Sequence, residues 1–180
     1  MTVFVLIVLL VVVVVILFFA FSTVLAMFFT RGVPFISTSA RLHGMILKTA
    51  DIKPGETVYD LGCGKASLLI KAAKQGALGR GYEISLWPYV WAKFNVWISR
   101  VPVKIHLKNF FKEDLSKADV VFCYLFPEVM VKLEDKFVKE MKPGSRLVSH
   151  AFKLPNLEPA EVIRTNEDNP ELGKIMVYRF

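Results

Sequence analysis

The N-terminal segment of the chain differs from the rest in its pattern of hydrophobic and polar residues. Between Val3 and Phe29 there is no charged residue, and only Ser22 and Thr23 carry a hydroxyl group. About 20 apolar residues in a helix, each adding about 1.5 Å, cross the hydrocarbon core of a membrane. This run is longer than that, so it predicts a transmembrane anchor over residues 1–30.

A cleaved signal peptide is the alternative interpretation of this run. It would combine a basic start, a shorter apolar core and a small-x-small cleavage site, and we do not recognise this combination in the sequence. No Lys or Arg precedes the run, whereas Arg31, Arg41 and Lys48 follow it. The positive-inside rule then predicts a single-pass membrane protein whose C-terminal domain lies in the cytoplasm.

The pattern after the anchor alternates between strands and helices. Short apolar runs are followed by stretches of helical periodicity, and turns rich in glycine or proline separate them. This alternation predicts an α/β, Rossmann-like domain with a mostly parallel sheet, closed by a C-terminal antiparallel hairpin. We divide the chain into an anchor (1–30), a linker with a pre-domain helix (31–56) and one domain (57–180).

The element boundaries follow from these runs and turns. The predicted strands are Thr57–Leu61, Arg80–Ile84, Val103–Leu107, Asp119–Leu125, Arg146–His150, Ala160–Thr165 and Lys174–Phe180. The predicted helices are one capped by Ser37 or Thr38 that ends at about Ala50, then Lys65–Gln75, Leu86–Ser99 and Pro127–Met141. The third of these helices carries a stripe at helical spacing, which we expect to belong to the core: Trp87, Val90, Trp91, Phe94 and Trp97.

The formal net charge of +7 falls wholly on the domain that follows the anchor. Its basic residues are scattered, which favours attraction to an anionic membrane surface over nucleic-acid binding. The two cysteines, Cys63 and Cys123, fall in predicted buried positions and are expected to be reduced, in agreement with a cytosolic domain. The three histidines are far apart and lack metal-ligand spacing, so no metal site is predicted.

The segment Val58–Gly64 ends an apolar strand in Asp-x-Gly-x-Gly and leads into a helix. In a βαβ unit, a nucleotide-like ligand lies against the bare backbone of such a turn, here at Gly62 and Gly64. The pyrophosphate-type Gly-x-Gly-x-x-Gly is absent, and the leading carboxylate of Asp60 favours a cofactor with a positive end. S-adenosylmethionine, which carries a sulfonium and an ammonium group, fits this description.

Further candidate site residues lie at or just beyond the ends of the other predicted strands. Glu83 would accept hydrogen bonds from two ribose hydroxyls, or be a surface glutamate. Asn109 would reach the adenine amine, and Phe110 would flank the ring or belong to the core. Tyr124 would line the passage to the transferred methyl group, or be a half-buried strand residue. His150 would act as a base or cap its strand. Methyl transfer chiefly needs alignment and exclusion of water, without a metal.

Five features of the sequence occur in the order known from an enzyme family. They are the apolar span; Val33-Pro34-Phe35; Tyr59-Asp60-Leu61-Gly62-Cys63-Gly64; Gly81-Tyr82-Glu83 with Trp87 and Trp91; and Leu125-Phe126-Pro127-Glu128 with Lys142-Pro143-Gly144 and Val148-Ser149-His150. With them, the chain from about Pro34 onward resembles class I S-adenosylmethionine-dependent methyltransferases. More narrowly, it resembles the membrane-anchored protein-lysine methyltransferases whose animal members modify the proteolipid ring protein of ATP synthase and the adenine nucleotide translocase.

The resemblance implies a lysine ε-amine as acceptor, and a site that the segment Pro34–Leu47 helps to form. It also implies that four residues hold the cofactor: Asp60, Gly62, Gly64 and Glu83. The family's loop usually continues with an acidic residue or Thr, then Gly, then Arg, where this chain has Lys65-Ala66-Ser67. Asn109 stands where an aspartate is usual.

The leading hypothesis is an enzyme that methylates lysine on a membrane-associated protein. An anchor would confine enzyme and target to one surface and so raise their effective concentration. The alternatives are a methyltransferase of a small molecule or lipid, and a cofactor-binding membrane scaffold without catalysis. Nucleic-acid methylation ranks below these, because no Asn/Asp-Pro-Pro-Tyr-like motif follows the fourth predicted strand.

Overall fold

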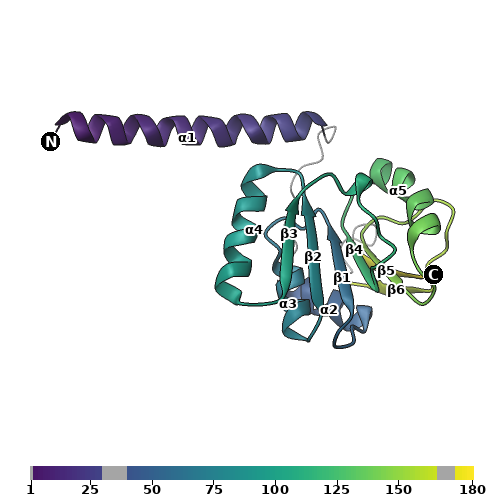
Figure 1. Cartoon of the computed structure of the whole chain (residues 1–180). Helices are drawn as coiled ribbons and strands as arrows, with labels where there is room; N and C mark the ends of the chain where they lie inside the picture. The colour runs from purple at the N-terminus through teal and green to yellow at the C-terminus, as the bar shows by residue number, and fades with distance from the viewer. Residues whose placement is uncertain (1, 30–39, 166–172) are drawn as a thin grey trace.

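A seven-stranded sheet in the order β3-β2-β1-β4-β5-β7-β6 forms the centre of the domain (Figure 1). The computed structural model describes residues 2–29, 40–165 and 173–180. Neighbouring strands from β3 to β5 are parallel, and β7 is antiparallel to both β5 and β6. The strands are β1 (Thr57–Leu61), β2 (Leu78–Glu83), β3 (Val103–Leu107), β4 (Val120–Cys123), β5 (Arg146–His150), β6 (Glu161–Arg164) and β7 (Lys174–Arg179).

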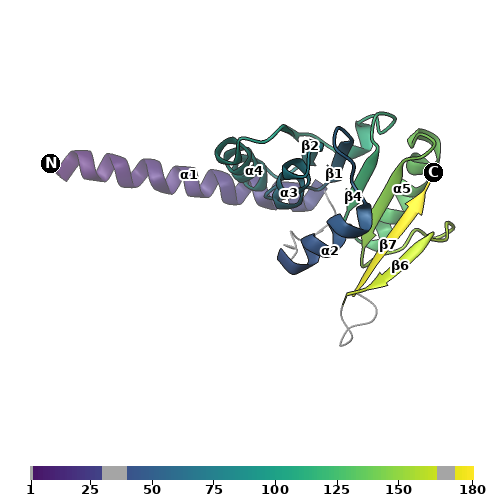
Figure 2. The same cartoon turned by 90° about the horizontal axis from the view of Figure 1, so that it is seen from below.

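Helices cover both faces of the sheet. Figure 2 shows α2, α3 and α4 on one face and α5 on the other. The helices are α1 (Thr2–Phe29), α2 (Ala40–Ala50), α3 (Ser67–Lys74), α4 (Leu86–Ser99), the short 3₁₀ helix η1 (Phe110–Lys112) and α5 (Pro127–Glu140). The predicted α/β class, parallel sheet and closing hairpin are therefore confirmed. The expected caps Ser37 and Thr38, and most of the turn between the last two strands, lie outside the described residues.

The core divides into two layers because successive strand residues point to opposite faces. Val58 on β1 packs in the layer under α2, α3 and α4, together with Phe122 and Val148. Its neighbour Tyr59 packs in the layer under α5, which also contains Val121. Burial on both faces is what makes the central strands continuous apolar runs in the sequence.

The expectation that the aromatic stripe of α4 belongs to the core is wrong. The buried residue of α4 is the small Ala92, through which the helix approaches the sheet, with Tyr89 and Val96 partly buried beside it. The stripe lies on the opposite side of the helix and is exposed to solvent in the chain, for example at Trp91 and Trp97. Helical periodicity showed that α4 has an apolar face, but not that the sheet would pack against the other one.

Helix α1 projects from the domain and crosses one end of α4 (Figure 1). By length and composition, its segment Thr2–Ser22 is able to cross a membrane, and it is the one such helix among the described residues. The ring of Phe19 meets the ring of Trp87 edge-on, with centroids 5.3 Å apart. The contact between α1 and the domain is therefore made by the first turn of α4.

Candidate functional site

The glycine turn after β1 lies at the carboxyl edge of the sheet, where open α/β sheets bind ligands. Gly62 and Gly64 have φ values of 85° and 53°, in the left-handed region that favours glycine. The N–H groups of Gly62 and Cys63 both donate to the carbonyl oxygen of Tyr82, at 2.9 and 3.0 Å. The turn is thereby tied to the end of β2, and its backbone has no Cβ at either glycine.

The Glu83 carboxylate is held in place by backbone N–H groups. Its Oε1 accepts hydrogen bonds from Ile84 and Ser85, both at 2.9 Å. Its Oε2 accepts one from Gly64 at 3.1 Å, so the acid reaches directly from β2 to the glycine turn. The structure thus brings together two of the predicted cofactor-binding elements, and one oxygen remains oriented even if the other turns to a ligand.

The Asp60 carboxyl is buried beside Glu83. Asp60 is only 8% exposed and lies opposite Gly81 in the register between β1 and β2. Burial, and then the negative charge of Glu83, raise the pKa of Asp60 from 3.8 to about 7. No cation among the described residues offsets these effects. The site therefore favours a ligand that brings positive charge to this carboxyl.

Close packing under the turn explains the glycine before Tyr82. A Cβ built on Gly81 would lie 2.6 Å from the Cys63 sulfur and 2.9 Å from side-chain carbons of Ile105 and Leu69. The Cys63 thiol is buried, and burial raises its pKa well above the usual range. A thiol of this kind is a poor nucleophile.

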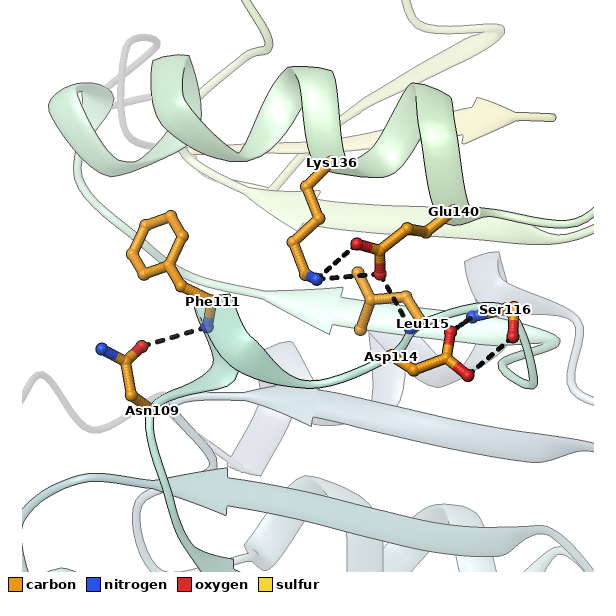
Figure 3. A network of polar contacts seen from close by, with 7 residues as sticks. All are labelled: Asn109, Phe111, Asp114, Leu115, Ser116, Lys136 and Glu140. Atoms are coloured by element: carbon orange, nitrogen blue, oxygen red, sulfur yellow. Dashed lines mark hydrogen bonds and ion pairs between the residues drawn. The ribbon is translucent and has the colours of Figure 1, made fainter.

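Asn109 and Phe110 lie beyond the end of β3, at the start of η1. Figure 3 shows the Asn109 side chain capping this short helix: its Oδ1 accepts a hydrogen bond from the Phe111 N–H at 3.0 Å. A carbonyl oxygen has a second lone pair, so this cap leaves Asn109 able to accept from an adenine amine. Phe110 packs partly against the core and partly against the Phe111 ring, 4.9 Å away between centroids.

Tyr124 and His150 meet at the carboxyl edge, from the ends of β4 and β5. Their ring centroids are 4.5 Å apart, and the rings are edge to face. Burial lowers the pKa of His150 from 6.5 to about 4. Its Nδ1 is buried and has no hydrogen-bond partner among the described residues. The structure thus places a neutral imidazole here, and its Nδ1 is available for a hydrogen bond to a ligand.

Two aromatic residues that the sequence analysis did not single out as site residues complete this cluster. Phe152 lies 6.4 Å from Tyr124 and 5.8 Å from Phe126, measured between ring centroids. A tight turn positions Phe152: Ala151 has a φ of 68°, and the Phe152 N–H donates to the His150 carbonyl at 2.9 Å. Such strain in a non-glycine residue often accompanies a functional site. The sequence carries no glycine there to signal the turn.

Lys65, which departs from the family's usual loop, does not direct its charge into the turn. Its ammonium nitrogen lies 6.0 Å from the centroid of the Trp91 ring on α4. Its carbonyl accepts a hydrogen bond from the Asn95 side chain at 3.0 Å. Among the described residues, no group of three or more His, Cys, Asp or Glu side chains is placed to hold a metal ion.

This site fits S-adenosylmethionine in three ways. The turn presents backbone without a Cβ, the buried carboxyl of Asp60 has no cation beside it among the described residues, and the Glu83 carboxylate stands at the end of the second strand. Together with the strand order, they define the class of S-adenosylmethionine-dependent methyltransferases.

Comparisons with known proteins agree with this class. The chain is 35% identical over 141 residues to a protein-lysine N-methyltransferase of Saccharolobus islandicus (strain REY15A), covering 76% of this chain and 88% of that protein. It is 32% identical to the adenine nucleotide translocase lysine N-methyltransferase of Mus musculus, covering 76% and 60%. The chain thus spans less than two thirds of this mammalian enzyme.

A solved structure is similar along most of the chain. The RNA methyltransferase from Salinibacter ruber, in complex with S-adenosyl-L-homocysteine, has a TM-score of 0.74 and 28% identity, covering 80% of this chain and 93% of that one. The model of the ANTKMT methyltransferase domain matches residues 60–161. This chain belongs to that family, and it is a methyltransferase whose cofactor is S-adenosylmethionine.

Proposed function

We propose that this chain methylates the side-chain amine of a lysine on a membrane-associated protein. The observation that carries the proposal is the aromatic cluster beside the glycine turn, formed by Tyr124, Phe126, His150 and Phe152. Aromatic faces attract a lysine ammonium and the methylated ammonium that replaces it. The names of the two relatives, one from an archaeon and one from a mammal, also support lysine as the acceptor.

The cluster favours attack by a neutral amine. A lysine that enters among the rings is removed from water, and this lowers its pKa, so that its proton leaves to solvent. Because burial holds the pKa of His150 at about 4, the imidazole adds no positive charge next to the lysine. We assign His150 a hydrogen bond to the amine through Nδ1 rather than the role of a base, and Tyr124 a place beside the same amine.

We assign the binding of the cofactor to four residues: Asp60, Gly62, Gly64 and Glu83. In this assignment Asp60 attracts the positive end of the cofactor and Glu83 accepts from the ribose, while Asn109 and Phe110 hold the adenine. When bound, the cofactor would supply a methyl carbon activated by positive sulfur, and transfer of this methyl group to the neutral amine would form a C–N bond, break the C–S bond and release S-adenosylhomocysteine. The protein residues align the two partners and exclude water.

The membrane part of the proposal rests on α1. Its length and composition suit a bilayer, and Arg31, Arg41 and Lys48 follow it, which favours a cytoplasmic domain. An anchored enzyme meets a membrane-associated target at high effective concentration.

Isotope-labelled S-adenosylmethionine, incubated with the full chain and membranes, tests the proposal. We expect label in a protein band, and mass spectrometry should find it on a lysine. Glu83→Ala should abolish labelling, because it removes the acid that spans β2 and the glycine turn. Glu161→Ala, an exposed change on β6 at the far edge of the sheet, is the matched control and should label normally.

The other possible products identify the alternatives. Label in the lipid extract would indicate lipid methylation instead of lysine methylation. Label in a small-molecule or RNA fraction would indicate that one of these is the acceptor. The RNA fraction is included because the structurally similar Salinibacter ruber protein is described as an RNA methyltransferase. Cofactor binding without any labelled product would indicate a scaffold.

A further inference from the structure

A continuous apolar surface covers the outside of α4. Neighbouring rings along it lie 5.7 to 6.2 Å apart between centroids, from Trp87 to Trp97. We define the α4 outer face by six side chains that are each at least 40% exposed: Trp87, Val90, Trp91, Phe94, Trp97 and Ile98. A contiguous apolar patch of large side chains marks a surface that another molecule covers.

The position of α1 indicates what covers this surface. Figures 1 and 2 both show the N-terminal part of α1 extending past α4 on the side away from the sheet, which is the side of the α4 outer face. Phe19 of α1 lies against Trp87 at one end of that face. At about 1.5 Å per residue, the segment Thr2–Phe18 beyond this contact is about 25 Å long, close to the thickness of a hydrocarbon core of about 30 Å.

Charge around the α4 outer face suits a lipid headgroup layer. The Lys65 ammonium lies over Trp91, and Lys93 and Arg100 are exposed along and at the end of the helix. No acidic residue occurs in α4. Tryptophan is enriched at the membrane–water interface, and basic side chains are attracted to anionic lipids there. All three tryptophans of the chain are on this face.

We propose that the α4 outer face lies in the headgroup region of the membrane that α1 crosses. This inference rests on the membrane anchoring that is part of the proposed function. Because α4 runs across the direction of α1 in Figure 1, a membrane-crossing α1 leaves α4 lying along the surface. Two attachments, one through α1 and one through α4, fix the orientation of the domain. The carboxyl edge, with its cofactor turn, is then held close to the lipid surface, and the acceptor is a lysine at that height.

The tryptophans themselves provide the test. The full chain with Trp87→Phe and Trp91→Phe keeps one reporter, Trp97, which is 73% exposed in the chain. It is reconstituted into phosphatidylcholine–phosphatidylglycerol vesicles, with and without bromine on the acyl chains near the headgroups. We expect blue-shifted emission that brominated lipid reduces by about half or more, as for an interfacial helix, and that acrylamide quenches weakly.

The control moves the reporter to the opposite side of the sheet. Val138, 57% exposed on α5, becomes the reporter through Val138→Trp in a chain with all three tryptophans changed to Phe. It should be quenched by acrylamide and not by brominated lipid. The inference would be overturned if Trp97, like this control, were quenched by acrylamide and not by brominated lipid. It would also be overturned if neither quencher reached Trp97, and that result would indicate that protein covers the α4 outer face.

Two other measurements on the same vesicles distinguish a failure of this inference from a failure of the proposed function on which it rests. Extraction by alkaline carbonate would refute anchoring by α1, and absence of labelled lysine would refute the methylation proposal. Lipid quenching of Trp97 decides the position of α4 in either case.

Discussion

Replacing Asp60 by Asn should make the protein more stable and a weaker binder of its cofactor. The Asp60 carboxyl has a pKa of about 7 in the folded chain against 3.8 as its ordinary value. Burial of the neutral carboxyl costs little, so as far as Asp60 is concerned the folded chain is most stable below pH 3.8. The free energy of unfolding falls as pH rises through both pKa values, because the buried carboxyl must then carry a charge. A difference of about three pKa units corresponds to about 4 kcal/mol at pH 8.

Asn carries no charge at any pH and removes this cost. Its buried amide will not find all its hydrogen bonds, which takes back about 1–3 kcal/mol. We expect a net gain of about 1–3 kcal/mol at pH 8, equivalent to a rise in Tm of about 3–10 °C for a domain of this size. The gain should shrink steadily toward pH 4, where Asp60 is protonated in the folded chain.

Cofactor binding should change in the opposite direction. Loss of a buried charge that faces a cation costs about 2–4 kcal/mol, or about 30- to 1000-fold in Kd. For the wild-type chain, affinity should fall about tenfold per pH unit below about 7, because a protonated Asp60 must lose its proton to receive the cation.

Circular dichroism in detergent and titration calorimetry measure these two effects. Asp135→Asn, the same chemical change at an exposed position on α5, is the control and should alter neither. If Asp60→Asn were no more stabilising at pH 8 than at pH 4, the argument from burial would be refuted. Unchanged affinity for S-adenosylmethionine would refute the assignment of Asp60 to the cofactor.

Four further substitutions, two of them combined in one double variant, test the glycine turn and the amino edge of the sheet. Gly62→Ala should lower stability by about 1–2 kcal/mol, because its φ of 85° is unfavourable with a Cβ, and should weaken cofactor binding measured by calorimetry. Gly81→Ala should cost about 1–3 kcal/mol in thermal unfolding through overpacking, and Cys63→Ala should relieve part of this in the double variant, since the new Cβ meets the Cys63 sulfur. Glu56→Gln should cost about 2–3 kcal/mol, because the Arg146 guanidinium, 2.6 Å away and mostly buried, loses its ion pair. The kcat of the Glu56→Gln variant in the labelling assay should not change. A loss of kcat at a temperature where this variant is still fully folded would contradict a purely structural role for Glu56.

The fold could be predicted from the sequence because the hydrophobic pattern of each element agrees with the burial of that element in the sheet. The strands Val103–Leu107 and Arg146–His150 and the helix Leu86–Ser99 have the predicted bounds. Each is an apolar or amphipathic run with a proline, glycine or charged turn on at least one side, and burial of both sheet faces keeps the strand signal strong. The positions of the glycine turn and of Glu83 could be predicted for a related reason, since both follow from the ends of neighbouring parallel strands at the carboxyl edge of the sheet.

The left-handed residues and the environment of α4 could not be predicted. Ala66 and Ala151 adopt φ values of 60° and 68° without glycine, so nothing in their identity announced that helix α3 begins at Ser67 or that Phe152 returns to Tyr124. For α4, periodicity identified an apolar face, but a core and a membrane both select apolar residues. Only the position of the small Ala92 against the sheet shows which face is inside.

The cofactor site and the α4 outer face are connected by a single turn. Ile84 and Ser85 hold the Glu83 carboxylate through their N–H groups, and the helix that carries Trp87 begins at the next residue. The separation between the two surfaces is therefore set by backbone hydrogen bonds rather than by a flexible linker. A rigid separation means that the height of the methyl donor above the lipid would be a property of the fold. Such a fixed height would restrict the methyl acceptor to a lysine at the same distance from the lipid surface.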